Sequence, residues 1–216
     1  MNALIFGATG SAGASVLKAT LADAAVTEVR VIVRRAPKRT SPKLRVFIHD
    51  DFLNFDKVSA AFDGVDACFF CLGVSSTQVK DEPTYRRITH DYAVAAAKAL
   101  KARSPKASFH FISGRSTDIN GRWMWARVKG EAERDVTELV DAVIYRPGAI
   151  DGEPSESAAR TWYEPLRGLF KLFAPFRSLY ITGDDLGRAM LQATREGLRR
   201  RILENPDMRD LADRAR

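Results

Sequence analysis

The chain is poor in residues that build disulfides and metal centres. Its 216 residues include two cysteines, Cys68 and Cys71, and three histidines, His49, His90 and His110. The cysteines are three residues apart in one apolar run, where a strand directs them to opposite faces, so they should not pair with each other. The histidines lack metal-ligand spacing. The sequence therefore predicts no disulfide and no metal, and a cytoplasmic location by default.

Long apolar runs are also missing. No run reaches the roughly 18 apolar residues that span a bilayer, and the first residues do not follow a signal-peptide pattern, so no membrane association is expected. The net charge is +7. Acidic and basic residues nevertheless alternate through most of the chain without a nucleic-acid-binding motif, so we expect no nucleic acid partner. The one concentrated basic stretch runs from Arg30 to Arg45, with no acidic residue among them.

A glycine pattern stands near the start of the chain. Gly7, Gly10 and Gly13 follow the apolar run 3–6 and open a helical pattern over 14–22. A strand, a glycine turn and a helix N-terminus form a binding site for the pyrophosphate of a dinucleotide. The alternative is an ordinary tight turn. The predicted cofactor contacts here are Gly7, Thr9, Gly10, Ser11, Ala12 and Gly13.

Apolar runs and helical patterns alternate along the chain. The expected strands are 29–33, 44–48, 67–70, 107–112 and 142–145, and the expected long helices are 81–103, 124–139 and 184–197. This alternation predicts an α/β Rossmann-type fold with a doubly wound parallel sheet. We expect one NAD(P)-binding domain over 1–216, with a core at 1–149 and a small C-terminal substrate lobe with helices at 150–216.

The C-terminal part has a different character. Residues 150–180 are rich in proline and aromatic residues. The apolar positions between Leu166 and Phe173 have helical spacing, which fits either a helix packed on the sheet or a lid over an apolar substrate. Thr182 is expected to cap the last clear helix, and 199–216 is expected to be a charged surface helix.

Arg34 follows the second predicted strand directly. In dinucleotide-binding folds an acidic residue there binds the ribose of NAD, whereas an arginine accommodates the 2′-phosphate of NADP. Arg35 and Lys38 are placed to assist. The sequence therefore predicts NADP(H) rather than NAD(H), and the alternative is a solvated basic loop.

Further candidates end the later strands, at the edge where such folds bind ligands. Asp51 follows the third strand and is either an adenine contact or a local cap. The backbone at 71–73 ends the fourth strand, with Cys71, Leu72 and Gly73 as cofactor contacts. Ser113 ends the fifth strand, and Lys129 lies on the following helix.

Several of these pieces occur together in one family. They are Gly7-x-x-Gly10-x-x-Gly13, Asp51-Phe52, Cys71-Leu72-Gly73, Phe111-Ile112-Ser113, Val128-Lys129-Gly130-Glu131-x-Glu133 and Arg146-Pro147-Gly148. In this order they resemble the atypical short-chain dehydrogenases/reductases of the NmrA-like, Tat-interacting-protein oxidoreductase-like kind. The resemblance implies a catalytic serine, tyrosine and lysine. It makes Ser113 and Lys129 catalytic candidates, and Phe52, Lys129, Pro147 and Gly148 cofactor contacts.

The expected tyrosine is absent. Trp125 stands four residues before Lys129, and an indole N–H does not exchange a proton near neutral pH. Two hypotheses follow. One is an NAD(P)H-dependent oxidoreductase acting on a carbonyl, quinone or other small apolar substrate with another proton donor: Tyr85, Tyr92, Tyr163, Ser113 or water. The other is an inactive redox sensor or regulatory protein with a protein partner. A sugar-nucleotide epimerase or dehydratase also suits the fold, but it depends more on the tyrosine.

Overall fold

The computed structural model describes residues 1–79, 81–156 and 176–216. Its centre is a seven-stranded sheet in the order β3-β2-β1-β4-β5-β6-β9, in which all neighbouring strands are parallel. The strands are β1 (Asn2–Phe6), β2 (Glu28–Val33), β3 (Leu44–Ile48), β4 (Ala67–Phe70), β5 (Ser108–Ile112), β6 (Ala142–Arg146) and β9 (Arg201–Glu204). The prediction of a Rossmann-type doubly wound parallel sheet is confirmed.

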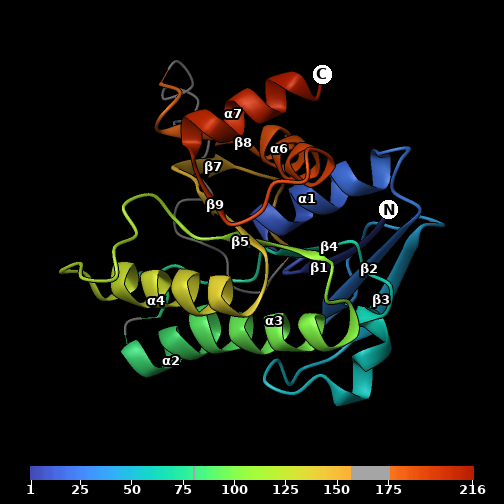
Figure 1. The fold of residues 1–216 in the computed structure, drawn as a ribbon, viewed down its shortest axis with the longest axis horizontal. Coiled ribbons are helices and arrows are strands. Elements are labelled where there is room, and N and C mark those ends of the chain that lie inside the picture. The colour runs from blue at the N-terminus through green and yellow to red at the C-terminus, as the bar shows by residue number, and fades with distance from the viewer. Residues whose placement is uncertain (80, 157–175) are drawn as a thin grey trace.

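Helices cover both faces of this sheet (Figure 1). On one face lie α1 (Ser11–Ala22), α6 (Gly183–Arg195) and α7 (Asn205–Arg214), and on the other lie α3 (Tyr92–Arg103) and α4 (Met124–Leu139). The central strands are therefore buried on both sides, which is why β1 and β4 are apolar runs without alternation. Adjacent residues of one strand enter different cores: Ile5 packs on the α1 side and Phe6 on the α3 side.

The connections agree closely with the sequence pattern. The crossover after β3 is a short 3₁₀ segment, η1 (Asp56–Phe62). The helix expected from residue 81 begins with α2 (Glu82–Arg86), where the Asp81 carboxylate accepts the Thr84 N–H at 2.9 Å. It passes through a π-helical turn, η2 (Arg87–Asp91), before α3. Thr182 caps α6 as expected, accepting the Asp185 N–H at 3.0 Å.

The C-terminal segment differs from the expectation of one surface helix over 199–216. Residues 201–204 form β9, which pairs with β6 and extends the main sheet. Only then does α7 begin, closed by reciprocal hydrogen bonds between Glu204 and Asp207. Tertiary pairing with β6 outweighs the polar composition of this short edge strand. A second, two-stranded parallel sheet joins β7 (Ala149–Asp151) to β8 (Tyr180–Thr182). The aromatic helix or lid expected between Leu166 and Phe173 lies outside the described residues.

Candidate functional site

The turn between β1 and α1 is built on backbone contacts that exclude side chains. Gly7 has φ +74°, and a Cβ there would lie 2.7 Å from the backbone carbonyl carbon of Cys71. A Cβ on Gly13 would lie 2.1 Å from the carbonyl oxygen of Gly7. Both glycines are therefore required by the fold itself, because the turn crosses the end of β4 and the helix begins directly against the turn.

Gly10 has a different environment. A Cβ at this position would meet only the carbonyl oxygen of Gly7, at 3.4 Å, and the φ of −86° suits any residue. Gly10 is also the N-cap of α1, and no side chain caps its first turn. Helix N–H groups without side-chain acceptors and an open approach suit an anionic pyrophosphate. The turn that holds Thr9, Ser11 and Ala12 therefore fits the dinucleotide predicted from the sequence.

A segment after β7 packs on this turn, which the sequence did not indicate. A Cβ on Gly152 would lie 2.6 Å from the carbonyl oxygen of Ser11. The Glu156 N–H donates to the carbonyl oxygen of Thr9 at 2.8 Å, and the Glu153 N–H donates to the Ser15 hydroxyl at 2.9 Å. The chain that leaves β7 therefore forms one wall of the pyrophosphate turn.

The basic loop after β2 lies beside the same segment. Arg34 and Arg35 are exposed at the carboxyl end of β2, next to β1. The Lys38 N–H donates to the Glu156 carboxylate at 2.8 Å, and Arg39 lies 3.7 Å from Glu153. Arg34 forms no ion pair with a described residue. Its guanidinium is accessible at the edge where a bound nucleotide presents its ribose.

Two predicted contacts follow β3. The exposed Asp51 carboxylate accepts the Leu53 N–H at 3.1 Å, a local turn bond that leaves its other oxygen accessible. The Phe52 side chain, by contrast, is only 3% exposed and packs against the rings of Phe6 and Tyr92. A cofactor would meet the Phe52 backbone rather than its ring.

The end of β4 contacts the turn between β1 and α1. The Cys71 N–H donates to the carbonyl oxygen of Phe6 at 3.1 Å, and burial raises the pKa of the Cys71 thiol well above its usual value. Leu72 packs beside the aromatic core, and Gly73 has open space where a Cβ would be. The backbone at 71–73 therefore borders the turn, and a ligand would have room to approach this backbone at Gly73.

Lys129 and Ser113 come together at the carboxyl end of β5. The half-buried Lys129 ammonium donates to the backbone carbonyl of Ser113 at 2.6 Å. Burial lowers the pKa of Lys129 to about 8, while the negative charge of Glu133 acts in the opposite direction. A Cβ on Gly114 would lie 3.1 Å from the Lys129 Nζ. Glycine at this position therefore makes room for the amine itself.

The Ser113 hydroxyl faces a buried ionic network. It donates to Glu133, and it lies 3.1 Å from the Thr117 hydroxyl. Glu133, 5% exposed, also accepts two hydrogen bonds from Arg146, at 2.6 and 3.0 Å. These hydrogen bonds fix the position of the Ser113 side chain. The sequence motif contained Glu133 and Arg146, but only their positions on α4 and β6 bring them together.

The Pro147-Gly148 turn is fixed by the segment before β8. The Pro147 carbonyl accepts the Arg115 N–H at 2.9 Å, and a Cβ on Gly148 would lie 2.2 Å from the Leu179 carbonyl oxygen. The Gly148 N–H donates to Asn205 at 3.0 Å. Asn205, 1% exposed, also donates to two backbone carbonyls near β8. No sequence signal marked Asn205, whose role depends on contacts between distant segments.

The candidate proton donors differ in their burial and contacts. Tyr85 is 1% exposed, and burial raises the pKa of its phenol. Tyr92 packs against Phe52 with tilted rings whose centres are 5.5 Å apart. Trp125 is half-buried on α4, one helical turn before Lys129. Tyr163 lies outside the described residues.

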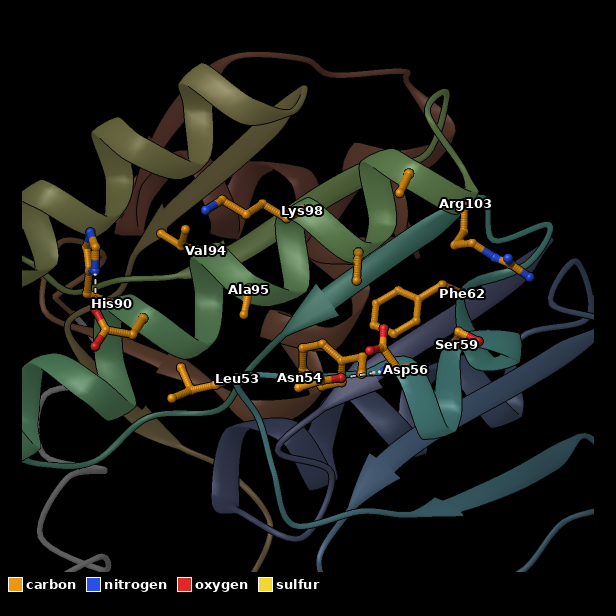
Figure 2. Close-up of a pocket in the computed structure, with 14 residues that line it drawn as sticks. Leu53, Asn54, Asp56, Ser59, Phe62, His90, Val94, Ala95, Lys98 and Arg103 are labelled. Carbon is orange, nitrogen blue, oxygen red and sulfur yellow. Dashed lines mark hydrogen bonds and ion pairs between the residues drawn. The ribbon is translucent and has the colours of Figure 1, made fainter.

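A hollow of about 870 Å³ lies apart from these residues, between the crossover 53–62 and α3. Figure 2 shows Ala95 on the helix side and Asn54, Asp56 and Phe62 on the crossover side. None of the predicted cofactor residues lines it. Among the described residues there is no cluster of three or more potential metal ligands, and no helix of that part is long and apolar enough to cross a membrane.

Comparison with known proteins agrees with this geometry. The NAD(P)H-binding family profile matches residues 7–195. Protein FMP52, mitochondrial, from Eremothecium gossypii is 30% identical over 71% of this chain and 68% of its own length. Protein HTATIP2 from Rattus norvegicus is 30% identical over 74% of this chain and 67% of its own length.

Solved structures share the fold at low sequence identity. A dTDP-glucose 4,6-dehydratase from Streptomyces venezuelae, with NAD bound, has a TM-score of 0.71 at 16% identity, covering 100% of this chain and 80% of its own. A UDP-glucose 4-epimerase has a TM-score of 0.73 at 14% identity, covering 97% and 80%. The chain thus belongs to the NAD(P)H-binding, NmrA-like family of atypical short-chain dehydrogenases/reductases.

Proposed function

We propose that this protein is an NADP(H)-dependent oxidoreductase that reduces a small carbonyl or quinone substrate. The observation that carries the proposal is the pairing of an open pyrophosphate turn at Gly10 with an accessible Arg34 at the end of the neighbouring strand. Arg34 would pair with a 2′-phosphate, and the turn would hold the pyrophosphate. When bound, the reduced nicotinamide supplies a hydride.

The chain's own residues have separable roles in this proposal. The first turn of α1 would donate its N–H groups to the phosphates, and Gly73 would allow close approach of the ligand. Lys129 is held at the end of β5 by the Ser113 carbonyl. The Ser113 hydroxyl donates to Glu133, so it orients the strand end rather than a substrate oxygen.

The preference for NADP(H) has a direct test. Replacing Arg34 with glutamine should weaken NADPH binding about tenfold or more while leaving NADH binding unchanged, because only NADPH carries the 2′-phosphate. Fluorescence titration of both cofactors measures this. Arg45→Gln is the matched control, since Arg45 lies on the edge strand β3 and pairs with Glu28 at 2.9 Å. Wild-type protein that binds NADH as tightly as NADPH contradicts the proposal.

The second candidate function is that of an NADP(H)-binding sensor without turnover. Two observations favour it: Trp125 replaces the proton-transferring tyrosine, and the Ser113 hydroxyl is committed to Glu133 and Thr117. A screen of carbonyls and quinones with NADPH separates the two functions. Cofactor binding without oxidation of NADPH by any of these substrates supports the sensor, whose partner would be another protein.

A further inference from the structure

The Lys129 ammonium lies at the end of β5, and no carboxylate of a described residue binds it. Among the described residues, the Lys129 Nζ donates to one neutral acceptor, the Ser113 carbonyl, at 2.6 Å. No ion pair with Lys129 occurs among the described residues. An ammonium has three N–H groups, so two remain for a ligand.

The other groups near Lys129 are excluded as proton donors by their contacts. Trp125 carries an indole N–H that does not titrate usefully. The Ser113 hydroxyl points to Glu133, and Glu133 is bound in turn by two N–H groups of Arg146 on β6. Tyr85 is buried, and burial raises its pKa further above neutrality. Among these groups, Lys129 is half-buried and able to exchange a proton.

We infer that the Lys129 ammonium is itself the proton donor of the reduction, in place of the missing tyrosine. This inference rests on the proposed function. The Nζ–H bond breaks and an O–H bond forms on the substrate oxygen, while the carbonyl carbon receives the hydride of the reduced cofactor. Lysine is left as a neutral amine and regains its proton from water. Gly114 contributes by accommodating the amine, because a Cβ there would lie only 3.1 Å from the Lys129 Nζ.

The surroundings of Lys129 suit this role. Its titration is governed by burial, which lowers the pKa to about 8, and by Glu133 one turn further along α4, which raises it. Arg146 of β6 neutralises Glu133 through its two hydrogen bonds. An acid with a pKa near the working pH is mostly protonated at pH 7 and gives up its proton readily.

The first test measures Lys129 without cofactor or turnover. Lysine labelled with ¹³C at Cε is titrated by NMR in the full chain, and the Lys129 signal is assigned by its loss in Lys129→Met. We expect a midpoint near 8 for this signal, against about 10.4 for surface lysines. A Lys129 midpoint in the range of the surface lysines overturns the inference.

The second test follows the pH dependence of NADPH-driven reduction. The protonated form is the active one, so kcat should be constant below pH 8 and fall above it. Lys129→Arg keeps the charge but does not release a proton, and should lower kcat by about 10²- to 10⁴-fold and remove the break near pH 8. Arg134→Gln, an exposed change on the same helix, is the control.

The outcomes separate the inference from the function on which it rests. Turnover in Lys129→Arg with the same rate and the same break overturns the inference and leaves the oxidoreductase intact. A wild-type protein that binds NADPH but reduces no carbonyl or quinone overturns both. Trp125→Tyr in the Lys129→Met background adds a second readout: recovered activity with a break at higher pH supports proton donation as the missing step.

Discussion

Replacing Gly13 with alanine should destabilise the fold and abolish cofactor binding together. The added Cβ would lie 2.1 Å from the carbonyl oxygen of Gly7 and 2.6 Å from its carbonyl carbon. Both are backbone atoms of a turn that itself presses against Cys71, so neither element moves without disturbing β4. We expect a loss of about 3 kcal/mol or more in the free energy of unfolding.

Gly10→Ala is the matched variant for this prediction. Its Cβ meets only one atom within 4 Å, at an ordinary contact distance. The fold should therefore keep its stability to within about 1 kcal/mol. The methyl group would nevertheless occupy the approach to the helix N-terminus and weaken NADPH binding about 100-fold. Urea unfolding and fluorescence titration measure the two effects. Equal stability losses in both variants contradict this division of roles.

Removing the Glu133 side chain should have the second large effect. Glu133→Ala deletes the acceptor of the Ser113 hydroxyl and of two Arg146 N–H groups. The Arg146 side chain is only 21% exposed and would keep its charge, since guanidinium does not lose its proton. Only the longer pair with Glu204, at 3.6 Å, would then remain for this charge, so we expect a loss of about 3 kcal/mol of unfolding free energy. The urea midpoint should fall accordingly.

Glu131→Ala provides the comparison on the same helix. Glu131 pairs with Arg86, and both side chains are more exposed, at 26% and 39%. Solvent screens such pairs, so the expected loss is below about 1 kcal/mol. Similar losses in the two alanine variants would mean that the Glu133 network contributes no more than a surface pair. Glu133→Leu, which fills the volume without an acceptor, should be as damaging as alanine.

The sequence by itself determined the architecture because the signals for it are local. The strands at 44–48 and 67–70 and the helix at 124–139 were predicted to the residue, since apolar runs and helical periodicity need only neighbours along the chain. The glycine turn could likewise be predicted, because the strand, the turn and the helix follow one another along the chain. The residues that follow each strand could be placed at one edge, since parallel strands end on the same side.

The tertiary structure alone decided which of these side chains are buried and which are exposed. Phe52 and the Ser113 hydroxyl turn inward, toward an aromatic core and toward Glu133, whereas Arg34 is exposed and Gly10 and Lys129 are half-buried. The seventh strand, β9, could not be predicted from the sequence. Its four residues form a strand because they pair with β6, and their own composition does not indicate it. The burial of these side chains and the pairing of β9 depend on contacts between segments that are distant along the chain. A local sequence pattern does not indicate which partner a side chain will contact.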